Sequence, residues 1–89
     1  MNENDIRTIV LTALGDVAPE ASPEEIDPSA SIQEQLDIDS MDFLDFVQAV
    51  AERTGVEVPE RDYEHLQTVD AAVEYLAART GAPSGASPS

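Results

Sequence analysis

Ser40 is the residue whose type and surroundings most directly indicate a chemical role. It lies where a polar, acidic connection gives way to an amphipathic segment, directly after Asp39. Aspartate is a favoured helix N-cap, so Ser40 should lie on a first helical turn, where unpaired backbone N–H groups and the positive helix end favour a phosphate. Asp37, Asp39 and Asp42 oppose the binding of a free anion, whereas a covalent phosphodiester tolerates them. We therefore predict that Ser40 is a point of covalent attachment through a phosphate group.

A hydrolytic serine is the competing enzymatic interpretation, because nucleophilic serines also stand at the starts of helices. Ser40 has no flanking glycine, and His65 is the only histidine of the chain. A serine nucleophile needs a base that a third group orients, and we expect His65 to lie on the surface of a short helix. The sequence therefore predicts no catalytic residue and no enzyme.

The carboxylates around Ser40 could also indicate calcium. An EF-hand loop that began at Asp37 would need glycine at its sixth position and glutamate at its twelfth. Asp42 and Gln48 occupy these positions, and the chain has no cysteine for a thiolate site or a disulfide. We therefore predict no metal site.

Acidic residues dominate the charge of the chain, with 19 Asp and Glu against 4 Arg and a formal net charge of −15. This balance excludes nucleic acid as a partner, because neutralising phosphates requires a basic surface. It favours protein partners with basic docking surfaces. No apolar run approaches membrane-spanning length and the segment after Met1 is polar, so we expect no membrane span and a cytoplasmic protein.

Apolar residues recur at helical spacing along most of the chain, which predicts an all-α fold in one small domain. Asn2 or Asn4 should cap the first helix, and Thr68 the last. Residues 81–89 contain only Gly, Ala, Pro and Ser and should form a flexible tail after a domain over 1–80. We expect helices over 4–17, from Ser40 to Thr54 before Gly55, over 60–66 and from 69 to Gly81, with a long connection over 18–38.

The helix expected from Ser40 has two distinct faces on a helical wheel. Asp42, Asp45 and Glu52 share a polar face. Phe43 points to the interior, whereas Phe46 lies at the edge of the apolar face. The apolar face comprises Phe43, Leu44, Val47, Val50 and Ala51.

Four segments together resemble the acyl carrier protein family, over roughly residues 4 to 80. Asp39-Ser40-Met41 is similar to the family's Asp-Ser-Leu signature. Two positions depart from the pattern: Asp37 stands where the family usually has glycine, and Met41 stands in place of leucine. The other similar segments are the loop from Asp27 to Leu36, Gly55 to Pro59, and Thr68 to Leu76.

The resemblance implies a bundle of three main helices plus one short helix, with a long first loop. It implies 4′-phosphopantetheine, which a separate phosphopantetheinyl transferase moves from coenzyme A to Ser40. Acyl groups would then be carried as thioesters, in fatty acid, polyketide or related biosynthesis. Met1 and the short length lead us to expect a stand-alone carrier, and we expect a monomer. Acyl-loading and acyl-processing enzymes with basic surfaces would dock on Asp39, Met41, Asp42, Asp45 and Glu52.

Two alternatives stay open at this point. A carrier of aminoacyl or peptidyl groups uses the same kind of serine and bundle, although the strong acidity favours acyl groups. An acidic interaction module that is never modified would share the charge but not the attachment.

Overall fold

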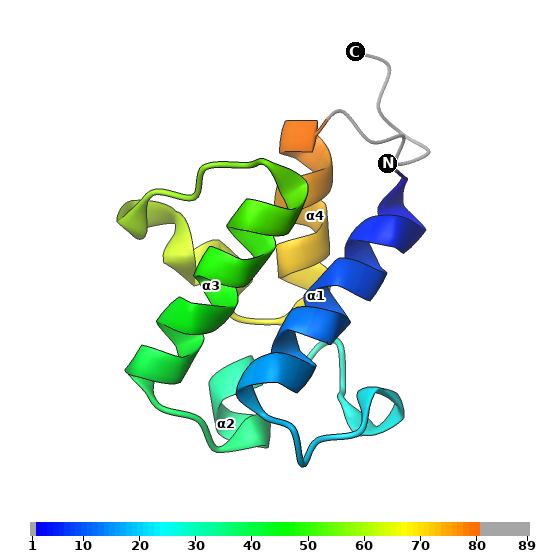
Figure 1. Cartoon of the computed structure of the whole chain (residues 1–89), viewed down its shortest axis with the longest axis vertical. Coiled ribbons are helices and arrows are strands. Elements are labelled where there is room, and N and C mark those ends of the chain that lie inside the picture. The colour runs from blue at the N-terminus through cyan, green and yellow to red at the C-terminus, as the bar shows by residue number, and fades with distance from the viewer. Residues whose placement is uncertain (1, 81–89) are drawn as a thin grey trace.

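Helices form all of the regular structure in residues 2–80, the part of the chain that the computed structural model describes. No strand occurs there, which confirms the predicted all-α class. The expected tail over 81–89 and the helix end at Gly81 lie outside the described residues. The elements are α1 (Glu3–Val17), the 3₁₀ helix η1 (Pro23–Glu25), α2 (Ile32–Leu36), α3 (Ser40–Thr54), the 3₁₀ helix η2 (Glu60–Leu66) and α4 (Val69–Thr80) (Figure 1).

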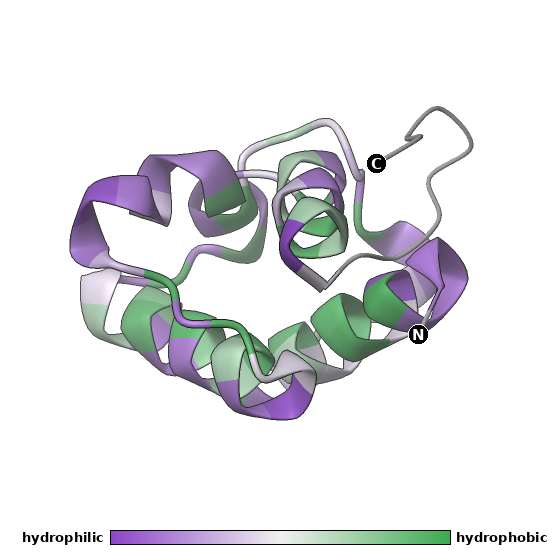
Figure 2. Ribbon diagram, turned by 90° about the horizontal axis from the view of Figure 1, so that it is seen from above, coloured by the Kyte–Doolittle hydropathy of each residue, from purple (hydrophilic) through white to green (hydrophobic). Residues whose placement is uncertain are grey.

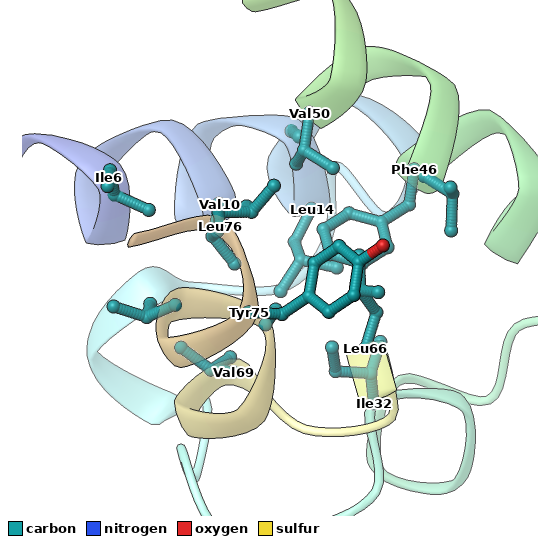
Figure 3. Close-up of a cluster of buried hydrophobic side chains, with 14 of the residues drawn as sticks. Ile6, Val10, Leu14, Ile32, Phe46, Val50, Leu66, Val69, Tyr75 and Leu76 are labelled. Carbon is teal, nitrogen blue, oxygen red and sulfur yellow. The ribbon is translucent and has the colours of Figure 1, made fainter. Parts of the chain in front are cut away.

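Helix α1 packs against both α3 and α4, and η2 packs against α4 (Figure 1). Hydrophobic and hydrophilic residues form separate bands along these helices (Figure 2). None of the described helices is long and apolar enough to cross a membrane. The centre of the core is formed by fully buried aliphatic side chains from α1, α2, α3, η2 and α4 (Figure 3). Among them are Ile6, Val10, Leu14, Ile32, Val50, Leu66, Val69 and Leu76.

Both phenylalanines of α3 are core residues, which corrects the expectation that Phe46 lies at the edge of the apolar face. Phe46 has no exposed surface and Phe43 is 5% exposed. Their ring centroids are 5.8 Å apart, and Figure 3 shows Phe46 in one cluster with Leu14, Leu66 and Tyr75. The wheel assumed a single covered face. The buried stripe is wider because Phe46 joins one core cluster with side chains from α1, η2 and α4.

Side-chain caps begin the three long helices where the sequence predicts them. Asn2 accepts a hydrogen bond from the Asp5 N–H, and the Asp5 carboxylate accepts one from the Asn2 N–H, which completes a capping box. The Thr68 hydroxyl accepts from the Ala71 N–H at 3.0 Å at the start of α4. Gly55 ends α3 with a φ of 74°, in the left-handed region that favours glycine.

The connection predicted over 18–38 contains two short helices that were not predicted from the sequence, η1 and α2. Ser31 caps α2 by accepting the Glu34 N–H, and Ile32 of this helix is fully buried. The Ile32 N–H also donates to the Gln67 carbonyl at 2.7 Å, and the Asp70 N–H donates to the Pro28 carbonyl at 2.9 Å. The connection is therefore fastened to the start of α4.

The Gln35 side chain holds the middle of this connection in place. Its Nε2 donates to the carbonyls of Asp27 and Ala30 at 2.8 and 3.2 Å, and its Oε1 accepts the Asp27 N–H at 2.8 Å. The N–H and hydroxyl of Ser29 both donate to Asp27 Oδ1, which lowers the pKa of the Asp27 carboxyl. A long loop costs little when its own polar groups are satisfied in this way.

An aromatic cluster attaches η2 to α4. The Tyr75 hydroxyl donates to Asp62 Oδ2 at 2.6 Å, and the Arg79 guanidinium lies 3.7 Å from the centre of the Tyr75 ring. The His65 ring stacks against the same ring at 5.9 Å. Burial, and then the bond to Asp62, raise the pKa of the Tyr75 hydroxyl. The Tyr75 hydroxyl therefore stays neutral and remains the donor in its hydrogen bond to Asp62.

Three of the four arginines join different pairs of elements. Arg7 on α1 pairs with Asp70 on α4 at 2.9 Å, and Arg53 on α3 pairs with Asp16 on α1 at 2.6 Å. Arg79 approaches Asp62 at 3.7 Å, between α4 and η2. The pairs are partly exposed and contribute little singly. Most of the 19 carboxylates consequently have no basic partner among the described residues.

Asp37 is the only non-glycine residue with a positive φ in residues 2–80, at 52°. It ends α2 in the left-handed conformation, and its N–H donates to the Gln33 carbonyl. Only glycine adopts this conformation freely, with Asn and Asp the most tolerant of the others. The backbone therefore explains why glycine suits the position in the family and why aspartate is an acceptable substitute.

We expect added salt to stabilise the fold, because the net charge of −15 produces self-repulsion. The Debye length is about 30 Å at 0.01 M and about 8 Å at 0.15 M, and a 15-residue helix is about 22 Å long. Raising NaCl between these concentrations should increase the melting temperature by about 5 °C or more. KCl should act equally, since the effect is screening. A flat melting temperature would contradict the prediction.

We expect Asp37→Asn to be more stable than Asp37→Ala by about 1 kcal/mol, because both variants lack the charge and only asparagine tolerates the left-handed backbone. Urea denaturation measures the difference in the free energy of unfolding. Asp37→Gly should be at least as stable as the wild type. Equal stabilities of the asparagine and alanine variants would show that this backbone position is not strained.

Candidate functional site

Ser40 is the first residue of α3, and its side chain is exposed. The first intrahelical bond runs from the Phe43 N–H to the Asp39 carbonyl at 3.0 Å. The N–H groups of Ser40 and Met41 therefore precede the hydrogen-bond ladder and point out of the helix end. The hydroxyl lies at the positive end of a 15-residue helix, where a phosphate group is stabilised.

Asp39 serves as the N-cap of α3. Its Oδ1 accepts the Asp42 N–H at 2.9 Å, and its backbone is extended. This carboxylate is committed to the helix end and is not hydrogen-bonded to the Ser40 hydroxyl.

An exposed stripe runs along α3 from Ser40 towards Gly55. Its residues are Met41, Asp45, Gln48 and Glu52, spaced four, three and four positions apart, as one side of a helix requires. Met41 is 71% exposed and is the only large exposed hydrophobic side chain among the described residues. Asp42 is half-buried beside this stripe. The structure thus brings the predicted surface residues together and adds Gln48, which the charge pattern did not indicate.

The charge around this stripe is almost entirely negative. The chain has no basic residue between Arg7 and Arg53, and that interval contains 11 carboxylates. Arg53 itself is bound to Asp16 of α1. The N-terminal end of α3 therefore carries a local negative field that complements a basic protein surface.

A hollow of about 430 Å³ lies beside the start of α3. It is bounded by the end of α1 with the following turn, by the end of α2, and by Asp42. Larger and similar hollows, of about 610 and 400 Å³, lie at the far end of α3 and beside Tyr75. The sequence offered no signal for the first hollow, because residues 17–21 and 35–42 meet only in the folded chain.

The two competing chemistries find no support in the geometry. His65 stacks on Tyr75, and no hydrogen bond within residues 2–80 connects it to Ser40. The same residues contain no group of three or more histidine, aspartate or glutamate side chains placed to hold a metal ion. The exposed serine, its open helix end and the absence of an attached base fit a covalent phosphate ester made by another protein.

Comparison with known proteins agrees with this arrangement. A family model described as a phosphopantetheine attachment site matches residues 4–76. The acyl carrier protein of Phenylobacterium zucineum is 36% identical over 77 residues, which cover 86% of this chain and 91% of that protein.

Two further relatives have the same extent. The acyl carrier protein of Chlamydia muridarum is 32% identical over 77 residues, covering 86% of this chain and 94% of that protein. That of Thermosynechococcus vestitus is 33% identical over 76 residues, covering 85% and 93%. The chain belongs to the acyl carrier protein family, and its cofactor is covalently attached 4′-phosphopantetheine.

Proposed function

We propose that this domain, over residues 1–80, carries acyl groups as thioesters on 4′-phosphopantetheine attached to Ser40. The proposal rests on the exposed Ser40 hydroxyl at the open N-terminal end of α3. Asp39, directly before it, is the N-cap of this helix. The match to a phosphopantetheine attachment model and the names of the relatives support it. Fatty acid, polyketide or related biosynthesis would use such a carrier.

In this proposal the chain takes part in one reaction, in which the Ser40 oxygen accepts the prosthetic group. Attachment joins Ser40 Oγ to the phosphorus of phosphopantetheine and releases the nucleotide portion of coenzyme A. The hydroxyl proton goes to a base of the transferase, and Asp39 keeps its hydrogen bond from the Asp42 N–H. Once bound, the group supplies the thiol that the chain lacks, since the sequence contains no cysteine. The domain presents cargo and does no catalysis.

Partner enzymes are proposed to dock on the exposed stripe of α3. Met41 offers a flexible apolar contact next to Ser40, and Asp45 and Glu52 offer carboxylates one and three turns further along. Asp39 and Asp42 add negative charge at the helix start. Basic docking surfaces on a phosphopantetheinyl transferase and on acyl-loading and acyl-processing enzymes are the complementary partners.

Ser40→Ala should abolish modification and leave the fold intact, because the substitution touches an exposed first-turn side chain. Intact-mass analysis after incubation with coenzyme A and a broad phosphopantetheinyl transferase measures the gain. Ser22→Ala is the matched control, since the Ser22 side chain makes no capping bond, and it should gain the full mass. A continued gain in Ser40→Ala would falsify the assignment.

Reversing Asp45 or Glu52 to lysine should lower kcat/KM of the transferase by roughly three- to tenfold at low salt, because a docking charge mainly changes the association rate. The loss should shrink at high salt through screening. Glu74→Lys, at an exposed position on α4, changes the net charge equally and should have little effect. If all three variants slow transfer equally, net charge and not the α3 stripe governs docking.

A further inference from the structure

We propose that the hollow beside Ser40 is the resting site of the pantetheine part of the prosthetic arm. This inference deepens the proposed function and rests on attachment at Ser40. The hollow has a volume of about 430 Å³, within the range of small-molecule sites, and Asp42 on its edge is two residues from the attachment point.

Proximity selects this hollow among those beside α3. Ile38 and Asp42 both line it, and the Cα atoms of residues two apart are at most about 7.6 Å from each other. The hollow of about 610 Å³ begins at Ala51, which lies about 16 Å from Ser40 along the helix. Of the two hollows, the smaller one is therefore the nearer to Ser40, within reach of an arm attached there.

The apolar part of the lining matches the apolar part of the arm. Val17, Ala21, Leu36 and Ile38 all line the hollow, and each is only partly buried against the core. The pantetheine chain carries two methyl groups on one carbon near its phosphate end. Placing these methyl groups against the four side chains removes apolar surface of both from water.

The polar part of the lining offers acceptors, and the arm offers donors. Asp37 and Asp42 line the hollow, and ionised carboxylates only accept hydrogen bonds. Pantetheine has one hydroxyl and two amide N–H groups. The Gln35 amide also borders the hollow, but its bonds to Asp27 and Ala30 occupy it. The phosphate is repelled by the two carboxylates and stays at the end of α3, so only the neutral chain enters.

The walls are fixed before an arm enters. The N–H groups of Asp37 and Ile38 both donate to the Gln33 carbonyl, which holds the end of α2. The Ala21 N–H donates to the Ala18 carbonyl at 3.0 Å, which holds the turn after α1. A preformed site binds an attached arm with little additional ordering.

NMR of the full chain before and after modification by coenzyme A and transferase tests this inference. We expect nuclear Overhauser contacts from the two arm methyl groups to the side chains of Val17 and Ala21, which are distant from Ser40 in sequence. Amide shifts over residues 17–21 should change on modification. Contacts only to residues 51–59, or none despite a complete mass gain, would overturn the resting site and leave attachment at Ser40 standing.

Two alanine variants provide a matched pair. Ala21→Leu fills the hollow, so it should remove the contacts to Val17 and at least halve the shift changes over residues 17–21, with the full mass gain retained. Ala78→Leu, at an exposed position on α4, should behave as the wild type. Unchanged contacts in Ala21→Leu would overturn the site. If Ala21→Leu does not fold, the presence or absence of the wild-type contacts to Val17 and Ala21 tests the resting site. Absence of any mass gain in the wild type would instead overturn the proposed function.

Discussion

The hydrogen bond from the Asp42 N–H to Asp39 Oδ1 fixes the start of α3, and the position of every functional group follows from it. Because the helix begins at Ser40, that hydroxyl lies on an open and exposed first turn. Phe43, three residues later, enters the core and holds the helix against α1. The same helix therefore anchors the domain with one side and presents Ser40 with the other.

The arginines and the unpaired carboxylates lie in different parts of the molecule. The paired arginines join α1 to α3 and α4, and α4 to η2, so they are used where elements meet. The exposed stripe of α3 contains no arginine. Leaving carboxylates such as Asp45 without a basic neighbour on the stripe costs stability through repulsion. The proposed docking of basic partners would offset this repulsion, and a loss of stability at functional surfaces is common.

Local signals in the sequence predicted most of the helices and the position of Ser40 on the first turn of α3. Asp39, Gly55 and Thr68 are caps whose chemistry acts within four residues, so their roles could be assigned without a structure. The same kind of signal was present at Ser31 and Glu34, whose spacing is that of a capping box, and it would have revealed α2. The left-handed backbone of Asp37 gives a physical reason for the family's preference for glycine.

Features that depend on contacts between distant segments could not be predicted. Phe46 is fully buried because it lies among side chains of other elements, including Leu14, Leu66 and Tyr75, and a helical wheel describes one helix alone. The hollow beside Asp42 arises only where the end of α1 and its following turn meet the end of α2. Periodicity predicts which residues face inward, whereas the shape of the space between elements depends on the packed chain.

Fragment mass spectrometry of the protein recovered from its native host shows which residue carries the prosthetic group and which cargo the group holds. We predict phosphopantetheine on Ser40 alone, within the segment between Asp39 and Met41, with an acyl thioester on part of the population. An aminoacyl or peptidyl thioester at Ser40 would contradict the proposed cargo and retain the site. A protein that is never modified, or modified at another serine, would contradict the account.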